Sequence, residues 1–123
     1  MQPQILILDE PAAGLDPRMK KEVMEMISQY RKENIATIIL ISHNMDDIAR
    51  YAERVVVMQK GKIVINGSVR ETFSQREKLA GMGLSVPLVT EIFDGLAGAG
   101  VPANKNIYTK AQARDELSRL FVR

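Results

Sequence analysis

Two adjacent acids follow the most continuously apolar stretch near the start of the chain. Asp9 and Glu10 come directly after residues 5–8, in the sequence ILILDEP. One carboxylate of such a pair can hold a hard divalent cation through water, and the other can orient or deprotonate a water molecule. Acids after a strand are also common in turns and helix caps, so the pair alone is more often structural than chemical.

The only histidine of the chain, His43, follows a second apolar stretch, TIILIS at residues 37–42. An imidazole N–H can donate to the negative charge that develops on a phosphate. A single histidine before a helix is more often a cap or a satisfied polar residue. His43 therefore gains a chemical interpretation only if it lies near the acid pair.

The elements between these residues predict that they meet. Residues 5–8 have the continuous apolar pattern of a central strand covered on both faces. Asp16 and Pro17 provide an N-cap and a first-turn proline, and apolar residues at helical spacing predict a helix over 17–33. Because residues 37–42 read as the next strand, a parallel pair with a right-handed crossover is expected.

Ligands of open parallel sheets gather at the carboxyl ends of the strands. Asp9 and Glu10 lie at that end of the first predicted strand, and Ser42 and His43 lie at that end of the second. The sequence therefore predicts an acid pair and an imidazole at one edge of the sheet.

The next part of the chain predicts a short helix and a hairpin. Asn44, with acids behind it, is expected to cap a helix over about 45–52. The segments RVVVMQ and KIVING flank Lys60-Gly61, which is typical of an antiparallel hairpin.

Helices are expected after residue 68. Ser68 with Glu71, and Thr109 with Gln112, match capping boxes. Helices are predicted over 86–98 and 110–121, with GLAGAGVPANKN as a flexible connection between them. Their predicted apolar faces are Leu88, Val89, Ile92, Phe93 and Leu96 in the first, and Ala113, Leu117, Leu120 and Phe121 in the second. We expect two domains, 1–74 and 75–123.

Composition narrows the function classes. The 123 residues are 46% hydrophobic, which is enough for a packed core. The 17 basic and 15 acidic residues are interspersed, which argues against a nucleic-acid-binding stripe. The absence of cysteine excludes disulfides and thiolate metal sites. Apolar runs are far shorter than the roughly 18 residues of a spanning helix, so membrane association is expected only through a partner.

Three motifs together resemble the nucleotide-binding domain of ATP-binding cassette (ABC) transporters. ILILDEP resembles the Walker B strand, AAGLDP resembles the D-loop, and LISHNMDDIARYAERVVVMQKGKIVINGS resembles the switch histidine with its following helix and hairpin. The match extends over residues 1 to about 70. It implies an α/β fold: a partial P-loop NTPase-like parallel sheet with crossover helices and a β-hairpin, followed by a small α-helical appendage.

The resemblance implies a role for each motif residue. Asp9 would hold Mg²⁺ through water, Glu10 would be the general base, and His43 would contact the γ-phosphate of ATP. The family's D-loop communicates across a dimer of such domains and corresponds here to Gly14, Leu15 and Asp16.

The tail resembles a particular subfamily. GMGLSVPLVTEIFDGLAGAGVP followed by YTKAQARDELSRLF is similar to the C-terminal extension of the ATPase subunits of energy-coupling factor transporters. These transporters take up vitamins and transition-metal ions, and such tails help to pair the two ATPase subunits. The resemblance implies a second ATPase subunit and integral membrane subunits as partners, no direct nucleic acid, and a peripheral position on the cytoplasmic side of the membrane.

The phosphate-binding loop of the family has no counterpart in this chain. No glycine begins a G-x-x-x-x-G-K-[ST] motif, and the adenine-stacking aromatic, the glutamine loop and the LSGGQ-type signature are also missing. These motifs precede the Walker B strand in the family, so we expect the chain to correspond to the back portion of an ATPase. We therefore expect this polypeptide alone to be inactive.

Two alternatives remain open. The cassette could belong to a soluble ATPase of DNA repair or translation, although the tail favours a transporter. The chain could also be a non-catalytic truncated module whose C-terminal helices bind a full-length partner.

Overall fold

The computed structural model describes residues 3–121 and divides the chain into two compact units, Met1–His43 and Asn44–Arg123. The first unit contains all the motif residues from Asp9 to His43. The second contains the hairpin and the remaining helices.

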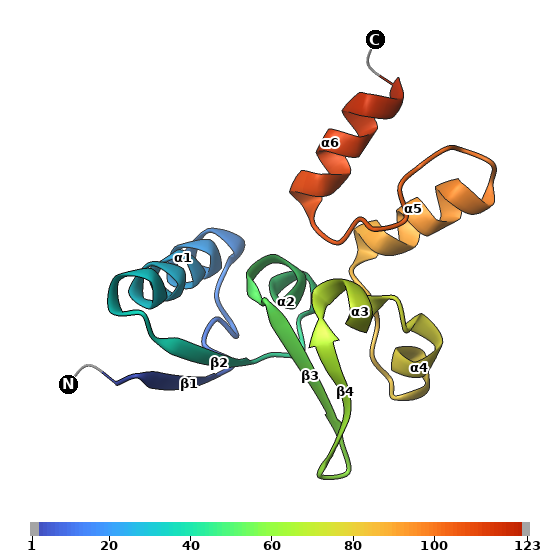
Figure 1. Ribbon diagram of the computed structural model, residues 1–123. Coiled ribbons are helices and arrows are strands. Elements are labelled where there is room, and N and C mark those ends of the chain that lie inside the picture. Colours follow the sequence, from blue (N-terminus) through green and yellow to red (C-terminus); the bar gives the residue numbers. More distant parts are fainter. Residues whose placement is uncertain (1–2, 122–123) are drawn as a thin grey trace. The chain divides into compact units, whose positions relative to one another are not determined.

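The first unit is a strand–helix–strand motif (Figure 1). Strand β1 (Ile5–Asp9), helix α1 (Pro17–Asn34) and strand β2 (Thr37–Ile41) follow in order. The two strands pair in parallel, with Ile5 opposite Thr37 and Asp9 opposite Ile41. The predicted parallel pairing is confirmed, and each element ends within one residue of its predicted limits.

The two faces of the β1–β2 sheet differ in exposure. Alternate residues of both strands are half-buried on one face and exposed on the other. The prediction that β1 is covered on both faces is wrong for the first unit by itself, because no described residue of this unit covers the second face. The exposed isoleucines, with exposed fractions between 47% and 62%, are Ile5, Ile7, Ile39 and Ile41.

Helix α1 has an ordinary start and a strained end. The Asp16 side chain accepts a hydrogen bond from the Met19 amide at 2.9 Å, and Pro17 occupies the first turn, as predicted. After the last turn, Ile35 adopts the left-handed conformation with φ 49° and ψ 42°. A β-branched residue is disfavoured there, where glycine is usual.

The second unit begins with helix α2 (Met45–Tyr51) and the antiparallel hairpin of strands β3 (Arg54–Gln59) and β4 (Lys62–Ser68). Lys60 and Gly61 both have positive φ, as a two-residue hairpin turn of the favoured twist requires. The predicted hairpin is confirmed.

Four helices follow the hairpin: α3 (Val69–Phe73), α4 (Arg76–Gly81), α5 (Leu88–Gly98) and α6 (Lys110–Phe121). Both predicted capping boxes are present. At the start of α3 the Ser68 hydroxyl accepts from the Glu71 amide, and the Glu71 carboxylate accepts from the Ser68 amide. At the start of α6 the main-chain amide of Gln112 donates to the Thr109 hydroxyl. The main-chain amide of Thr109 donates to the side-chain oxygen of Gln112.

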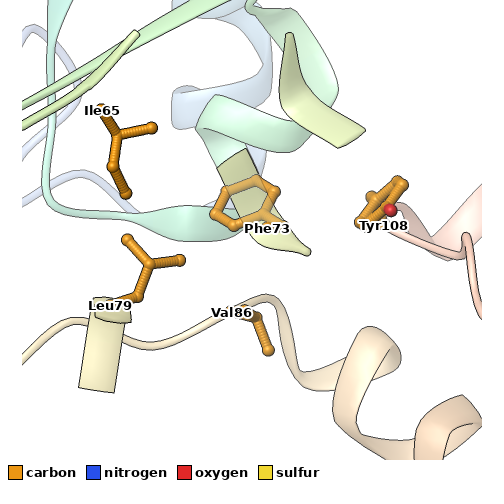
Figure 2. Packing of buried hydrophobic residues seen from close by; sticks show 5 residues of the cluster. All are labelled: Ile65, Phe73, Leu79, Val86 and Tyr108. Atoms are coloured by element: carbon orange, nitrogen blue, oxygen red, sulfur yellow. The ribbon is translucent and has the colours of Figure 1, made fainter. Parts of the chain in front are cut away.

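Figure 2 shows the main core of the second unit, formed by Ile65, Phe73, Leu79, Val86 and Tyr108. The rings of Phe73 and Tyr108 lie 6.1 Å apart and are tilted by 33°. This core contains residues from both sides of position 75. The boundary between the two compact units follows His43 instead. The packing therefore does not follow the predicted division of the chain into domains 1–74 and 75–123. This division stays a prediction about which part of the chain has which function.

Helices α5 and α6 bury only part of the apolar faces predicted for them: Val89, Phe93, Leu96, Ala113 and Leu120 pack as predicted. A second small core combines Phe93 of α5 with Ala113 of α6 and Ile107 between them. The polar residues Thr90 and Glu116 are also buried. Apolar periodicity alone misplaces four residues that are in fact exposed: Leu88, Ile92, Leu117 and Phe121.

The segment between α5 and α6 is anchored, although its composition predicts a flexible connection. The Thr90 hydroxyl donates to the Ile107 carbonyl at 2.6 Å, and the Asn104 amide donates to Glu116 at 2.8 Å. Arg119 donates both to Glu116 and to the Pro102 carbonyl. The hydrogen bonds from Arg119, and then that from Asn104, lower the pKa of Glu116 to about 2.

No helix within residues 3–121 has both the length and the apolar character that crossing a bilayer requires.

Candidate functional site

The end of β1 places Asp9 and Glu10 differently. Asp9 is the last residue of the strand, opposite Ile41, and is exposed. Glu10 leaves the sheet in the left-handed region with φ 47°, and its amide still donates to the Ile41 carbonyl at 2.8 Å. The Ala13 amide donates in turn to the Glu10 carbonyl at 3.1 Å. The main-chain amide and carbonyl of Glu10 are therefore both hydrogen-bonded, and these bonds hold the residue in its strained conformation.

The carboxylate of Glu10 lies against His43 at the end of β2. Its Oε1 accepts a hydrogen bond from the main-chain amide of His43 at 2.9 Å and contacts the ring Nδ1 of the same residue. Because an ionised carboxylate can only accept, that ring nitrogen carries the proton and Nε2 is left to other partners. The structure thus brings together Glu10 and His43, which are far apart in sequence.

The two side chains differ in their exposure to solvent. The Glu10 side chain is 31% exposed, whereas that of His43 is 84% exposed. A half-buried carboxylate with a fixed backbone is a good water-orienting group, and an exposed imidazole can approach a ligand. The pair therefore has the geometry for general-base chemistry beside a bound phosphate.

Asp9 is the predicted cation ligand of this edge. Within residues 3–121, no three carboxylates and imidazoles lie close enough together to form a metal site made by protein alone. Mg²⁺ commonly binds to one or two carboxylates and completes its shell with water and substrate phosphates. A single exposed carboxylate fits that mode and does not fit an all-protein cage.

The loop after Glu10 leads into α1. Gly14 has φ 76°, and the Leu15 amide donates to the Ala12 carbonyl at 3.3 Å. Asp16 caps the helix through its side chain. Asp16 therefore already has a structural role, and any contact across a dimer would be an additional one.

Sequence reasoning identified the residues at this edge but missed how they are joined. The left-handed backbone of Glu10 has no signal in the sequence, since glutamate is not a residue typical of that region. The side-chain types also do not indicate the hydrogen bond that the main-chain amide of His43 makes. It could be anticipated only from the register of the two parallel strands.

Comparisons with known proteins agree on one group of relatives. No family model matches the chain. The chain is 43% identical over 119 residues to the energy-coupling factor transporter ATP-binding protein EcfA2 of Acetivibrio thermocellus, a match over 97% of this chain and 42% of that protein. It is 44% identical over 119 residues to the protein of the same name from Caldanaerobacter subterraneus, again over 97% of this chain and 42% of the relative.

A solved structure supports the same relationship. The structure of cbiO1 from Clostridium perfringens, described as part of the ABC transporter complex cbiONQ, is 38% identical to the chain, with a TM-score of 0.54. The match covers 65% of this chain and 32% of that one. The chain thus spans 42% of the length of these two relatives.

Proposed function

By homology over nearly its whole length, the chain belongs with the ATP-binding proteins of energy-coupling factor transporters, and from that premise we propose that it forms the hydrolytic edge of such an ATPase. In the complete protein, ATP hydrolysis would energise uptake across the membrane. The chain spans 42% of the length of its relatives, so this activity is assigned to the protein that also contains a phosphate-binding loop.

The observation that carries this proposal is the contact between Glu10 and His43 at the carboxyl ends of two parallel strands. This edge is where ligands of open parallel sheets bind. A carboxylate and an imidazole at one point can activate water and contact the phosphate that the water attacks.

Each residue then has a distinct role. Glu10 orients the attacking water and accepts its proton, and the His43 imidazole donates its ring N–H to the terminal phosphate of ATP when the ring turns away from Glu10. Asp9 would hold Mg²⁺ through water, and the ion would supply positive charge beside the phosphates of the nucleotide. Gly14, Leu15 and Asp16 form the loop that faces the second ATPase subunit.

The proposed partners follow from the same relatives. We assign the protein to a complex of two ATPase subunits and integral membrane subunits, on the cytoplasmic side of the membrane. One relative with a solved structure is described as part of a transporter complex, which supports this assignment. ATP and Mg²⁺ are the cofactors of the complete protein.

A chimera tests the proposal directly. The 119 matching residues of the Acetivibrio thermocellus protein are replaced by those of this chain, and ATP hydrolysis is measured beside the unaltered relative. We expect the chimera to hydrolyse ATP, and we expect Glu10→Gln to lower kcat at least about 100-fold because a general base typically contributes that much. Lys62→Gln, on the hairpin, is the matched control that changes one surface charge outside the site.

An inactive chimera beside an active relative would contradict the proposal. So would a Glu10→Gln chimera that hydrolyses ATP as fast as its parent.

A further inference from the structure

His43 holds the Glu10 carboxylate through two groups that differ in mobility. The main-chain amide donates to Oε1 at 2.9 Å, and the ring Nδ1 contacts the same oxygen. The amide belongs to the backbone just beyond β2. The ring is 84% exposed and can rotate about its side-chain torsions.

The sheet fixes the position of the amide relative to Glu10. Asp9 is paired with Ile41, and the Glu10 amide donates to the Ile41 carbonyl at 2.8 Å. The His43 amide lies two residues beyond that bond, so the register that places Glu10 also places the amide. No comparable restraint on the ring is present among the described residues.

We propose that the main-chain amide of His43 is the positioning group for the Glu10 carboxylate, and that the imidazole can leave this carboxylate for a ligand without releasing it. The two functions of His43 are then separate: its backbone orients Glu10, and its ring is available to a phosphate. The significance of this separation for hydrolysis rests on the proposed function, whereas the hydrogen bond itself does not.

Amide hydrogen exchange in the full 123-residue chain tests the proposal without any nucleotide. Exchange is measured by NMR at residue 43, with rates corrected for the intrinsic effect of each side chain. The Thr37 amide, which donates to the Gln4 carbonyl at 2.8 Å, reports in the same spectra whether the β1–β2 pair is intact.

Three variants separate the amide from the ring. Glu10→Ala should speed exchange at residue 43 at least about tenfold, because it removes a charged acceptor. Glu10→Gln keeps a side-chain oxygen and should restore most of the protection. His43→Ala removes the ring and should leave the rate at residue 43 within about twofold of that of the parent chain, since the acceptor and the amide both remain.

Two results would overturn the proposal. If His43→Ala speeds exchange as much as Glu10→Ala does, the ring is the anchor. If residue 43 or Thr37 exchanges at its intrinsic rate in the parent chain, the proposed bond or the sheet that positions it is absent. Neither result depends on the ATPase chimera. Failure of the proposed function can therefore be distinguished from failure of the proposal about the His43 amide.

Discussion

The Glu10 carboxylate accepts a hydrogen bond from the main-chain amide of His43 at 2.9 Å, although 33 positions separate the two residues in the chain. The parallel pairing of β1 with β2 removes that separation by placing both strand ends at one edge. A group from each strand is therefore available to a single ligand.

The chain alone is expected not to bind Mg-ATP tightly. Asp9, Glu10 and His43 can stabilise charge on a phosphate, but no glycine-rich loop within this sequence can hold the phosphates. Isothermal titration with Mg-ATP should give no binding with a Kd below about 100 µM. The active chimera provides the positive control, and micromolar binding by the chain itself would refute the prediction.

Replacing Ile35 by glycine should stabilise the first unit. Ile35 is 94% exposed and lies in the left-handed region after α1, where a residue with a Cβ is disfavoured by about 1–2 kcal/mol. Ile35→Gly should raise the free energy of unfolding by about 1 kcal/mol in urea denaturation, because the strain is removed and little buried area is lost. Ile35→Val keeps the β-branch and should give no gain; an equal gain in that variant would contradict this explanation.

Replacing Gly67 by alanine should weaken the start of α3. A Cβ at position 67 would overlap the carboxylate of Glu71, which caps the helix through the Ser68 amide, and would lie only 3.3 Å from the Glu71 Cβ. We expect Gly67→Ala to lower the free energy of unfolding by about 1 kcal/mol, the usual cost of losing a cap.

A double-mutant cycle checks that cause. When Glu71→Ala has already removed the carboxylate, Gly67→Ala should cost much less, because the displaced group is gone. Equal costs in the two backgrounds would show that the capping interaction is not what alanine disturbs.

The stability supplied by Glu116 should depend on pH. Hydrogen bonds from Arg119 and the Asn104 amide lower its pKa from 4.5 to about 2, so the folded state favours the ionised form. Its contribution is fully present above pH 4.5 and is lost as the pH falls towards about 2. The difference in unfolding free energy between the parent chain and Glu116→Gln, measured by denaturation at several pH values, should narrow across that window.

Glu91→Gln is the matched control, since Glu91 lies on α5 and is exposed, and its side chain has no hydrogen bond or ion pair within residues 3–121. A Glu116→Gln difference that stays constant between about pH 6, above that window, and about pH 2.5, within its lower part, would contradict the proposed linkage.

Most elements could be predicted because each has a local cause. Asp16 and Pro17 start α1, Lys60 and Gly61 form the hairpin turn, and the Ser68–Glu71 capping box starts α3. These signals act over a few residues and survive in any surroundings that allow the element.

Helix α4 and the α5–α6 interface could not be predicted in the same way. Helix α4 has six residues, no side-chain N-cap and a single buried residue, Leu79, so it lacks a periodic pattern. The interface buries Thr90 and Glu116. The Thr90 hydroxyl donates to the Ile107 carbonyl and the Glu116 carboxylate accepts from the Asn104 amide, and both partners are distant in sequence. Partners that lie far away in sequence leave no local signal.

At the candidate site, the sequence predicts which residues gather but not how they are held. The positions of Glu10 and His43 follow from strand order and crossover handedness. The left-handed backbone of Glu10 depends on bonds to Ile41 and Ala13 that form only after folding.

The anchored segment between α5 and α6 has a consequence for proteolysis. Lys105 lies in this glycine-rich stretch and is exposed, so composition alone would mark it as a ready site for trypsin. Cleavage requires the backbone to open into an extended form. Because the amide of Asn104 and the carbonyls of Pro102 and Ile107 are all hydrogen-bonded to the helices, the protease must first release these contacts, and digestion after Lys105 should be slow.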